Sequence, residues 1–351
     1  MWNPLENWRQ RRARQRYMPQ ARPVRSGRTA QAAVLLLGLI LLVSALLELR
    51  GDDRGAALAA YVAEGGMAPL DLVERAGRTR RLIFLADIAG SNATKRFAAE
   101  VIERLARTSE LDVVALGIDA DEQPYIDTYL HTGQEDASLL ITRPRLLHEA
   151  EGVSEGYLAI FRKVRRLNEA LGADRQIRIL ALDPPDWPPA RAVAPHELAR
   201  RFGARDEHMH RTIGTLLQRE PRARVLFVLD GLHVLRGSGG SVQTGGTRTV
   251  RTTWLASRLE QEYPQDVYSI LVDAPASRSA APPVAAYRGT AAGPLLAERR
   301  GDDPVGIALA GPFGFTRQPI RVAGRPGIRF EHEPHGLTLP EVANAYIYLG
   351  N

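Results

Sequence analysis

Residues 85–92, LADIAGSN, mark the point where an apolar run stops and a helical pattern begins. The run before them is RLIFLA at 81–86, and the pattern after them is ATKRFAAEVIERL at 93–105. Loops held by a rigid strand and helix are frequent positions for binding and catalytic groups. This loop offers one acid, Asp87, together with a glycine, a serine and an asparagine. The sequence therefore raises the question of whether the loop is a working site or a degenerate one.

The alternation of apolar runs and amphipathic stretches continues along the chain. Continuous apolar strands separated by helices are typical of a parallel sheet that is covered on both faces. We therefore predict an α/β domain over 81–351, with a mostly parallel sheet and helices on both of its faces. The predicted strands are 82–86, 112–118, 177–182, 225–229, 267–272 and 346–349, and the predicted helices are 93–108, 154–171, 205–219 and 248–262.

Three further segments interrupt this pattern. Residues 49–80 are predicted to be a linker with one helical segment at 56–64. Glycine and serine dominate 237–246, which is predicted to be a loop, and residues 274–304 are rich in Pro, Ala, Gly and Arg and are predicted to be a longer one.

Composition restricts the classes of function. The chain of 351 residues contains no cysteine, which excludes disulfides, thiolate chemistry and cysteine zinc sites. Its net charge of +6 comes from the N-terminal tail, because residues 1–29 hold eight arginines and one acid. The rest of the chain keeps 38 of the 46 basic residues and 39 of the 40 acidic residues. A nucleic-acid site needs basic charge clustered on the folded domain, so we do not expect nucleic acid as a partner.

A membrane anchor explains the basic tail. Residues 29–47 form a run of 19 residues without a charge, long enough to cross the hydrocarbon of a bilayer as a helix. We predict a single transmembrane helix over 30–48 after a basic tail over 1–29. Positive charge stays on the cytoplasmic side, so the N-terminus is predicted to be cytoplasmic and the domain periplasmic, on a bacterial inner membrane. The alternative, a cleaved secretion signal, would need an unusually long basic region and a cleavage site that the sequence does not show.

The anchor and the tail also supply the predicted contacts with partners and lipid. In the tail, tryptophan and leucine recur at spacings of three, which places them on one face of a short helix at the membrane interface. The predicted partners are the lipid bilayer and integral membrane protein subunits. The residues expected to contact them are Trp2, Leu5, Trp8, Leu36, Leu39 and Leu42.

Acids follow several of the predicted strands. Asp87, Asp119, Asp183 and Asp230 stand at strand ends, and His233 comes three residues after the last of them. In open α/β sheets, ligands bind outside the carboxyl ends of the strands, so these side chains are candidates for a site. The alternative is that each aspartate only caps the following turn or helix, as aspartate often does.

The order of these motifs resembles that of the erythromycin esterase-like family, which is related in fold to ChaN-like proteins. That family has a strand ending in GExxHG, a strand ending in glutamate, an asparagine on a helix, a strand ending in aspartate, an RD helix, an HNxHV strand and a final strand near the C-terminus. The corresponding positions here are Asp87 to Ser91, Asp119, Asn168, Asp183, Arg205-Asp206, Asp230 to Val234 and Ala343 to Tyr348. The resemblance covers about 82–349 and implies the esterase-like fold.

The departures from the family's motifs concern its hydrolytic groups. The resemblance implies that the GExxHG glutamate and histidine, the second glutamate and the first histidine of HNxHV carry the reaction. In this chain those positions hold Asp87, Gly90, Asp119 and Asp230, and His233 is the histidine that remains. Aspartate in place of glutamate withdraws the carboxylate by about 1.5 Å, and misplacement on that scale is costly. Glycine in place of histidine removes the base that activates water. We interpret the site as degenerate.

Two functional hypotheses follow. The first is a non-catalytic, membrane-anchored extrinsic subunit, without cofactor or metal, that serves as a scaffold in a bacterial membrane complex, with respiratory or photosynthetic complexes as candidates. The second is a metal-dependent or residual hydrolase in the periplasm that acts through Asp87, Asp119, Asp230 and His233. Oxygen-rich sites of this kind suit Mg²⁺, Mn²⁺ or Ca²⁺.

Overall fold

The computed structural model describes the α/β domain and leaves the N-terminal region out of the description. The described residues are 56–57, 59–88, 91–134, 153–187, 194–237, 239–244, 248–274, 303–309, 321–322, 328–332 and 339–350. The predicted tail and transmembrane helix lie outside them, as do Gly90 and the predicted contacts Trp2, Leu5, Trp8, Leu36, Leu39 and Leu42. No helix within the described ranges has the length and hydropathy needed to span a bilayer.

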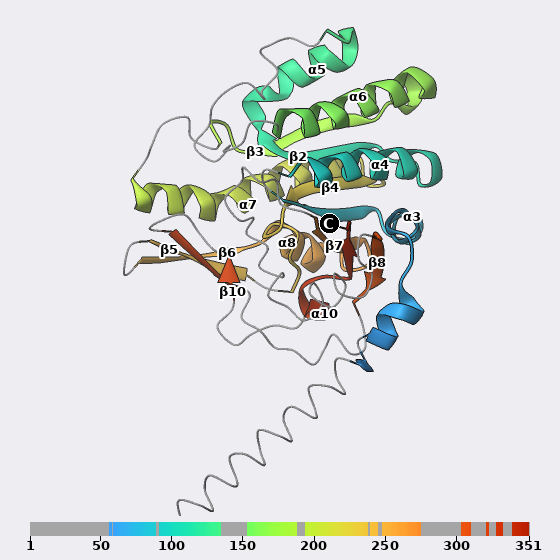
Figure 1. Ribbon diagram of the computed structural model, residues 1–351. Coiled ribbons are helices and arrows are strands. Elements are labelled where there is room, and N and C mark those ends of the chain that lie inside the picture. Colours follow the sequence, from blue (N-terminus) through green and yellow to red (C-terminus); the bar gives the residue numbers. More distant parts are fainter. Residues whose placement is uncertain are drawn as a thin grey trace, which may run out of the picture. The chain divides into compact units, whose positions relative to one another are not determined.

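A seven-stranded sheet forms the centre of the described domain (Figure 1). Its strand order is β3-β2-β4-β1-β7-β11-β8, and all neighbouring pairs are parallel except β11 and β8. The prediction of a mostly parallel sheet is confirmed. The strands are β1 (Leu82–Asp87), β2 (Val113–Asp119), β3 (Arg178–Asp183), β4 (Val225–Asp230), β7 (Val267–Asp273), β8 (Val305–Ala308) and β11 (Ala345–Tyr348).

The connections between strands decide which helices cover which face. The chain moves toward one edge of the sheet as it passes from β1 to β2 and from β2 to β3, and toward the other edge from β3 to β4 and from β4 to β7. Such crossovers are right-handed, so the two sets of helices lie on opposite faces. The first set is α4 (Asn92–Thr108), α5 (Gln123–Thr132) and α6 (Val153–Leu171), and the second set is α7 (Pro195–Arg219) and α8 (Leu255–Glu262) (Figure 1).

The centre of the sheet is fully apolar on both faces. Every residue of β1 is buried, and its Phe84 stacks on Phe227 of β4, with 4.1 Å between the ring centroids. The two phenylalanines are partners in the strand register. Burial on both faces explains why the strands read as continuous apolar runs rather than as an alternating pattern.

The domain begins earlier in the chain than the sequence predicts. Residues 59–65 are helical, in agreement with the predicted helix at 56–64. Helix α3 (Pro69–Thr79) lies in the segment predicted as a linker, yet Leu72 and Val73 are buried in the main core. The segment is polar on average and amphipathic, and the apolar stripe of such a helix is sufficient to dock it on the sheet.

A second, antiparallel sheet replaces two predicted elements. Its strand order is β6-β5-β10-β9, and it lies against α7 (Figure 1). Residues 248–253, predicted as the start of a helix, form β6, and the glycine-rich segment predicted as a loop contains β5. Both predictions were wrong because β5 and β6 pair with each other and β5 pairs on its other side with β10, a partner far along the chain that local periodicity does not reveal. The strands are β5 (Gly239–Thr244), β6 (Arg248–Thr253), β9 (Arg321–Val322) and β10 (Ile328–His332).

Close packing of α6 on the start of α4 depends on Gly156. A Cβ atom at this position would lie 2.6 Å from Cδ and 2.7 Å from Cβ of the buried Lys95. The backbone N–H of Gly156 donates a hydrogen bond of 3.1 Å to the side chain of Asn92 at the start of α4. The missing side chain therefore allows the two helices to meet next to the end of β1.

We predict opposite effects for two glycine-to-alanine substitutions in helices. Gly156→Ala should lower the free energy of unfolding by about 1–3 kcal/mol, the range for overpacking a filled site. Gly214→Ala on α7 is the matched control, because no atom of the described part of the chain lies within 4 Å of a Cβ atom there. It should raise stability by about 0.5–1 kcal/mol through the helix preference of alanine. Urea denaturation followed by circular dichroism measures both, and equal effects would contradict the proposed packing.

Candidate functional site

A row of aspartates lies along the carboxyl edge of the parallel strands. In the described part of the chain, β3, β2, β4, β1 and β7 are neighbours in that order, and each ends in an aspartate. Asp87 of β1 is level with Asp230 of β4, and Asp119 of β2 is level with Asp183 of β3. The sequence identified these four acids. It missed Asp273 of β7, although the same signal, an apolar run that ends in aspartate, precedes it.

This edge is where the fold places a ligand site. The connections that follow β1 and β4 leave toward opposite faces of the sheet, and the same holds for β2 and β3. Open α/β sheets bind ligands at such switch points, outside the carboxyl ends of the strands. The residues that pair with each aspartate therefore decide whether its carboxylate is available to bind a ligand or accept a proton.

Asp87 forms a buried ion pair with Lys95, a residue that the sequence did not nominate. The Lys95 Nζ atom lies 2.7 Å from Asp87 Oδ2, and the Thr94 hydroxyl donates a hydrogen bond of 2.5 Å to Oδ1. Lys95 is 1% exposed, and its ammonium lies 5.0 Å from the centre of the Tyr157 ring. Burial is the main cause that raises the pKa of Tyr157 well above its ordinary value, and the charge of Asp87 adds to it. Both carboxylate oxygens of Asp87 are thus engaged within the protein.

Arg205 of α7 links the ends of two strands. Its Nε and Nη2 atoms donate to the two oxygens of Asp183 at 2.6 and 2.9 Å, and its Nη1 atom donates to Asp230 Oδ2 at 2.8 Å. Burial opposes the charge of Arg205, but the two carboxylates outweigh it and raise the pKa of the guanidinium. The guanidinium also lies 5.1 Å from the centre of the Trp187 ring.

The guanidinium of Arg205 passes over the end of β2, which separates β3 from β4. Residue 117 of β2 is glycine, and a Cβ atom there would lie 3.5 Å from Arg205 Nη2 and 3.8 Å from Asp183 Oδ2. These are ordinary contact distances, so a methyl group would fit, whereas a longer side chain at 117 would enter the space that the ion pair occupies.

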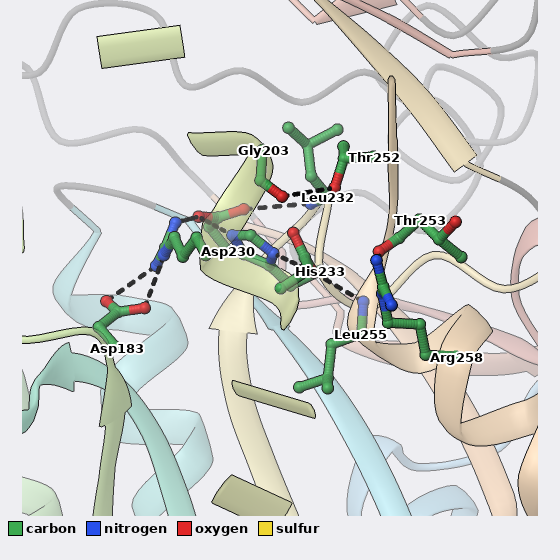
Figure 2. Close-up of polar contacts among 11 residues, drawn as sticks. Asp183, Gly203, Asp230, Leu232, His233, Thr252, Thr253, Leu255 and Arg258 are labelled. Atoms are coloured by element: carbon green, nitrogen blue, oxygen red, sulfur yellow. Dashed lines mark hydrogen bonds and ion pairs between the residues drawn. The ribbon is translucent and has the colours of Figure 1, made fainter. Parts of the chain in front are cut away.

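His233 is held between two carboxylates, and Figure 2 labels one of them, Asp230, beside the ring. Its Nδ1 atom lies 2.8 Å from Asp206 Oδ1, and its Nε2 atom lies 3.2 Å from Asp230 Oδ2. Burial lowers the affinity of the ring for a proton, but Asp206 and Asp230 outweigh this and raise the pKa of His233 to about 9. Asp206 also accepts the backbone N–H of Leu255 at 2.7 Å, which fixes its orientation. The two carboxylates therefore favour the protonated form of His233 at neutral pH.

Asp230 is the most exposed of the charged groups in this network, with 38% of its side chain accessible. Partial burial disfavours its charge, but His233 and Arg205 outweigh that effect and lower the pKa of Asp230 far below its ordinary value. Its Oδ1 atom accepts the backbone N–H of Leu232 at 3.2 Å (Figure 2). A carboxylate that holds its charge so strongly is a weak proton acceptor.

The remaining predicted positions have structural partners. Asp119 caps the short 3-10 helix η1 (Ala120–Glu122) by accepting the backbone N–H of Asp121 at 2.9 Å, as the capping alternative anticipated. Asn168 bonds both backbone groups of Ile177 at 2.7 and 2.9 Å, just before β3. Asp273 accepts the Tyr346 hydroxyl at 2.9 Å.

The structure does not gather Asp87, Asp119, Asp230 and His233 into one set of metal ligands. Among the residues that it describes, no group of three or more His, Asp or Glu side chains is arranged to hold a metal ion. Asp230 and His233 do lie together, whereas Asp87 is paired with Lys95. Gly90, the position where the family's motif has histidine, is outside the described residues.

We predict that Arg205→Met destabilises the domain strongly. The substitution leaves Asp183, which is 2% exposed, without its bidentate partner, and removal of one partner of a buried pair costs about 3–5 kcal/mol. The matched control is Arg178→Met, which breaks an ion pair with Glu220 whose side chains are 51% and 41% exposed. It should cost about 1 kcal/mol or less. Urea denaturation compares the two, and equal midpoints would show that the buried network is not stabilising.

We also predict that His233 stabilises the fold in a pH-dependent way. Its folded-state pKa of about 9 lies above the ordinary value of 6.5. The contribution of its charge is therefore complete below about pH 6.5 and is lost as the pH rises through about 9. NMR titration of the imidazole should show a midpoint near 9, and Asp230→Asn should lower it because one carboxylate becomes neutral. A His233 resonance that titrates near its ordinary pKa in the native protein would refute the assignment.

Comparison with known proteins tests the predicted fold. No protein-family model and no curated protein matches the sequence. A mutant of the erythromycin esterase EreC in its open conformation is 8% identical, with a TM-score of 0.50 over 80% of this chain and 93% of that one. A protein from Bacillus cereus is 10% identical, with a TM-score of 0.53 over 84% and 97%. A succinoglycan biosynthesis protein is 9% identical, with a TM-score of 0.52 over 84% and 97%. At these identities the likeness concerns the fold alone, and the chain has an esterase-like α/β fold.

Proposed function

We propose that this chain is a non-catalytic, membrane-anchored accessory subunit of a bacterial membrane complex, and that its esterase-like domain is a scaffold for partner chains. The observation that carries the proposal is the position of the His233 ring between the carboxylates of Asp206 and Asp230. A general base must be unprotonated and near its operating pH. The two carboxylates raise the pKa of His233 to about 9, which favours the protonated ring at neutral pH.

The other groups at the edge support the same conclusion. Asp230 is paired with Arg205, and its lowered pKa makes it a weak base. Asp87 is paired with Lys95 and bonded to Thr94. Activation of water by either carboxylate would first require a buried or partly buried ion pair to break, which is energetically costly.

The same contacts weigh against the alternative of a metal-dependent or residual hydrolase. A cation bound through Asp87, Asp119, Asp230 and His233 would have to displace the ammonium of Lys95, which already occupies the carboxylate of Asp87. It would also need His233 as a neutral ligand, because an imidazolium has no free lone pair. We therefore favour the non-catalytic function.

The membrane part of the proposal rests on the sequence. The uncharged run at 29–47 and the eight arginines before it suit a single-pass helix on the bacterial inner membrane, with the domain in the periplasm. We propose that integral membrane subunits and lipid contact the helix and the tail through Trp2, Leu5, Trp8, Leu36, Leu39 and Leu42. Respiratory and photosynthetic complexes are candidate hosts because they recruit single-helix accessory subunits.

Purification of the full chain tests this function. Affinity purification from native membranes in mild detergent should recover integral membrane proteins in fixed stoichiometry, and the double variant Trp2→Ala, Trp8→Ala should recover less of them. The matched control is Tyr125→Ala, an exposed aromatic residue of the domain, which should leave recovery unchanged.

The same preparation should not hydrolyse a panel of esters and lactones faster than its Asp230→Asn variant does. A chain that purifies alone as a monomer would contradict the scaffold function. Hydrolysis that is lost in Asp230→Asn would contradict the non-catalytic assignment and favour a residual hydrolase.

A further inference from the structure

A cleft of about 410 Å³ lies beside the aspartate row, between the end of β3 and one face of α7. Its volume falls within the range of small-molecule sites, about 300–1,000 Å³. Pro184, Pro185 and Ala204 give it an apolar surface. None of the residues assigned to the ion-pair network lines it, although Arg205 stacks on Trp187, which forms part of its wall.

Basic side chains line the cleft along α7. Arg200, Arg201, His208 and Arg211 are spaced by three, four or seven residues around Ala204, which places them on one face of the helix. Guanidinium groups bind carboxylates and phosphates through pairs of hydrogen bonds, so this wall has the chemistry of an anion site.

The charges of Arg200 and Arg201 are partly compensated at one end of the cleft. Both donate to Glu197, and their hydrogen bonds lower the pKa of that carboxyl to about 2. Arg201 also lies 3.3 Å from Asp186. Arg200 makes these hydrogen bonds through its Nε and Nη2 atoms, and Arg201 makes them through its Nε and Nη1 atoms. The Nη1 group of Arg200 and the Nη2 group of Arg201 take no part in these four bonds.

The charge of Arg211 is less compensated at the other end. The carboxylate paired with it, Glu207, lies 3.9 Å away, and the Arg211 side chain is 70% exposed. This charge affects the neighbouring His208. Burial lowers the pKa of His208, the charge of Arg211 lowers it further, and the charge of Asp183 acts in the opposite direction. The lowered pKa favours the neutral ring of His208 at neutral pH, with one N–H to donate. Among the described residues, no carboxylate lies within hydrogen-bond distance of the neighbouring Arg211.

We propose that this cleft binds an organic oxyanion, a carboxylate or phosphate carried on an apolar body. The oxyanion would pair with Arg211 and accept a hydrogen bond from His208, and the apolar body would lie on Pro184, Pro185 and Ala204. The inference goes beyond the scaffold function and does not depend on it, because the cleft uses none of the groups on which the non-catalytic assignment rests.

Calorimetric titration of the full chain in detergent tests the site. Phenyl phosphate and benzoate should bind and identify the preferred oxyanion, whereas phenol, which has the same ring without the charge, should not. Arg211→Met should weaken the binding of the preferred anion about tenfold, as expected for loss of a hydrogen bond to a charged group. Arg219→Met is the matched control, because Arg219 is exposed on the same helix outside the cleft, and it should leave affinity unchanged.

The pH dependence gives a second readout. A bound anion offsets the effect of Arg211 and raises the pKa of His208, so binding takes up a proton and should tighten from about pH 8 to about pH 6. Arg211 and Asp183 act on the ring, and Arg200, Arg201 and Asp186 are the other charged groups of the cleft. His208→Phe should abolish this dependence for benzoate, whose charge does not change over this range, whereas phenyl phosphate itself titrates at about pH 6. The proposal fails if neither anion binds at about 10 mM, if phenol binds as well as the anions, or if Arg211→Met and Arg219→Met bind alike.

Discussion

The pairing of Arg205 with Asp183 and Asp230 is the interaction on which the carboxyl edge of the sheet depends. One guanidinium on α7 holds the ends of β3 and β4, which flank β2, and so joins a helix on one face to two strands of the sheet. Through Asp230 the same network reaches His233 and then Asp206, which lies next to Arg205 on α7. The chain of contacts therefore closes on the helix where it began, and each carboxylate in it has a cation as a neighbour.

This closed network links stability and chemistry at one place. A catalytic site keeps a group whose proton is easily gained or lost, which requires its charged and neutral forms to be close in free energy. Here neighbouring opposite charges favour the charged form of both His233 and Asp230. The interactions that order the strand ends are thus the interactions that remove a proton acceptor from them. The esterase-like architecture surrounds this network.

The sequence predicted the sheet and most of the acids but not their cationic partners. Apolar runs that end in aspartate are local signals, so β1 to β4 and four of the five acids could be identified. Arg205 and Lys95 lie in amphipathic helices, where a basic residue ordinarily faces water. The strand order explains why Arg205 meets the ends of both β3 and β4, whereas Lys95 meets Asp87 at the end of the strand just before its helix. The error at β6 has another origin, because its partner β5 is adjacent in the chain but lies in a glycine-rich segment without an apolar pattern. β5 in turn pairs on its other side with β10, which is remote in the chain. Apolar periodicity reports neither the pairing of polar strands nor the partners of buried cations.

Lys95 is a second buried cation that pairs with an aspartate at this edge of the sheet. The chain has only two lysines against 44 arginines, yet one of the two is buried beside Asp87. An ammonium has three donors, and the surroundings offer three acceptors: Asp87 Oδ2 at 2.7 Å, the Ser91 carbonyl at 3.4 Å and the face of the Tyr157 ring at 5.0 Å. A guanidinium would bring five donors and a larger planar group into a space already limited by Gly156, and would leave donors buried without partners. Lysine therefore matches this position by its number of donors and by its size. Its direct contacts are with residues other than those of Arg205, and the two ion-pair groups meet electrostatically at Tyr157, whose pKa responds to Asp87, Asp183, Arg205 and Asp230.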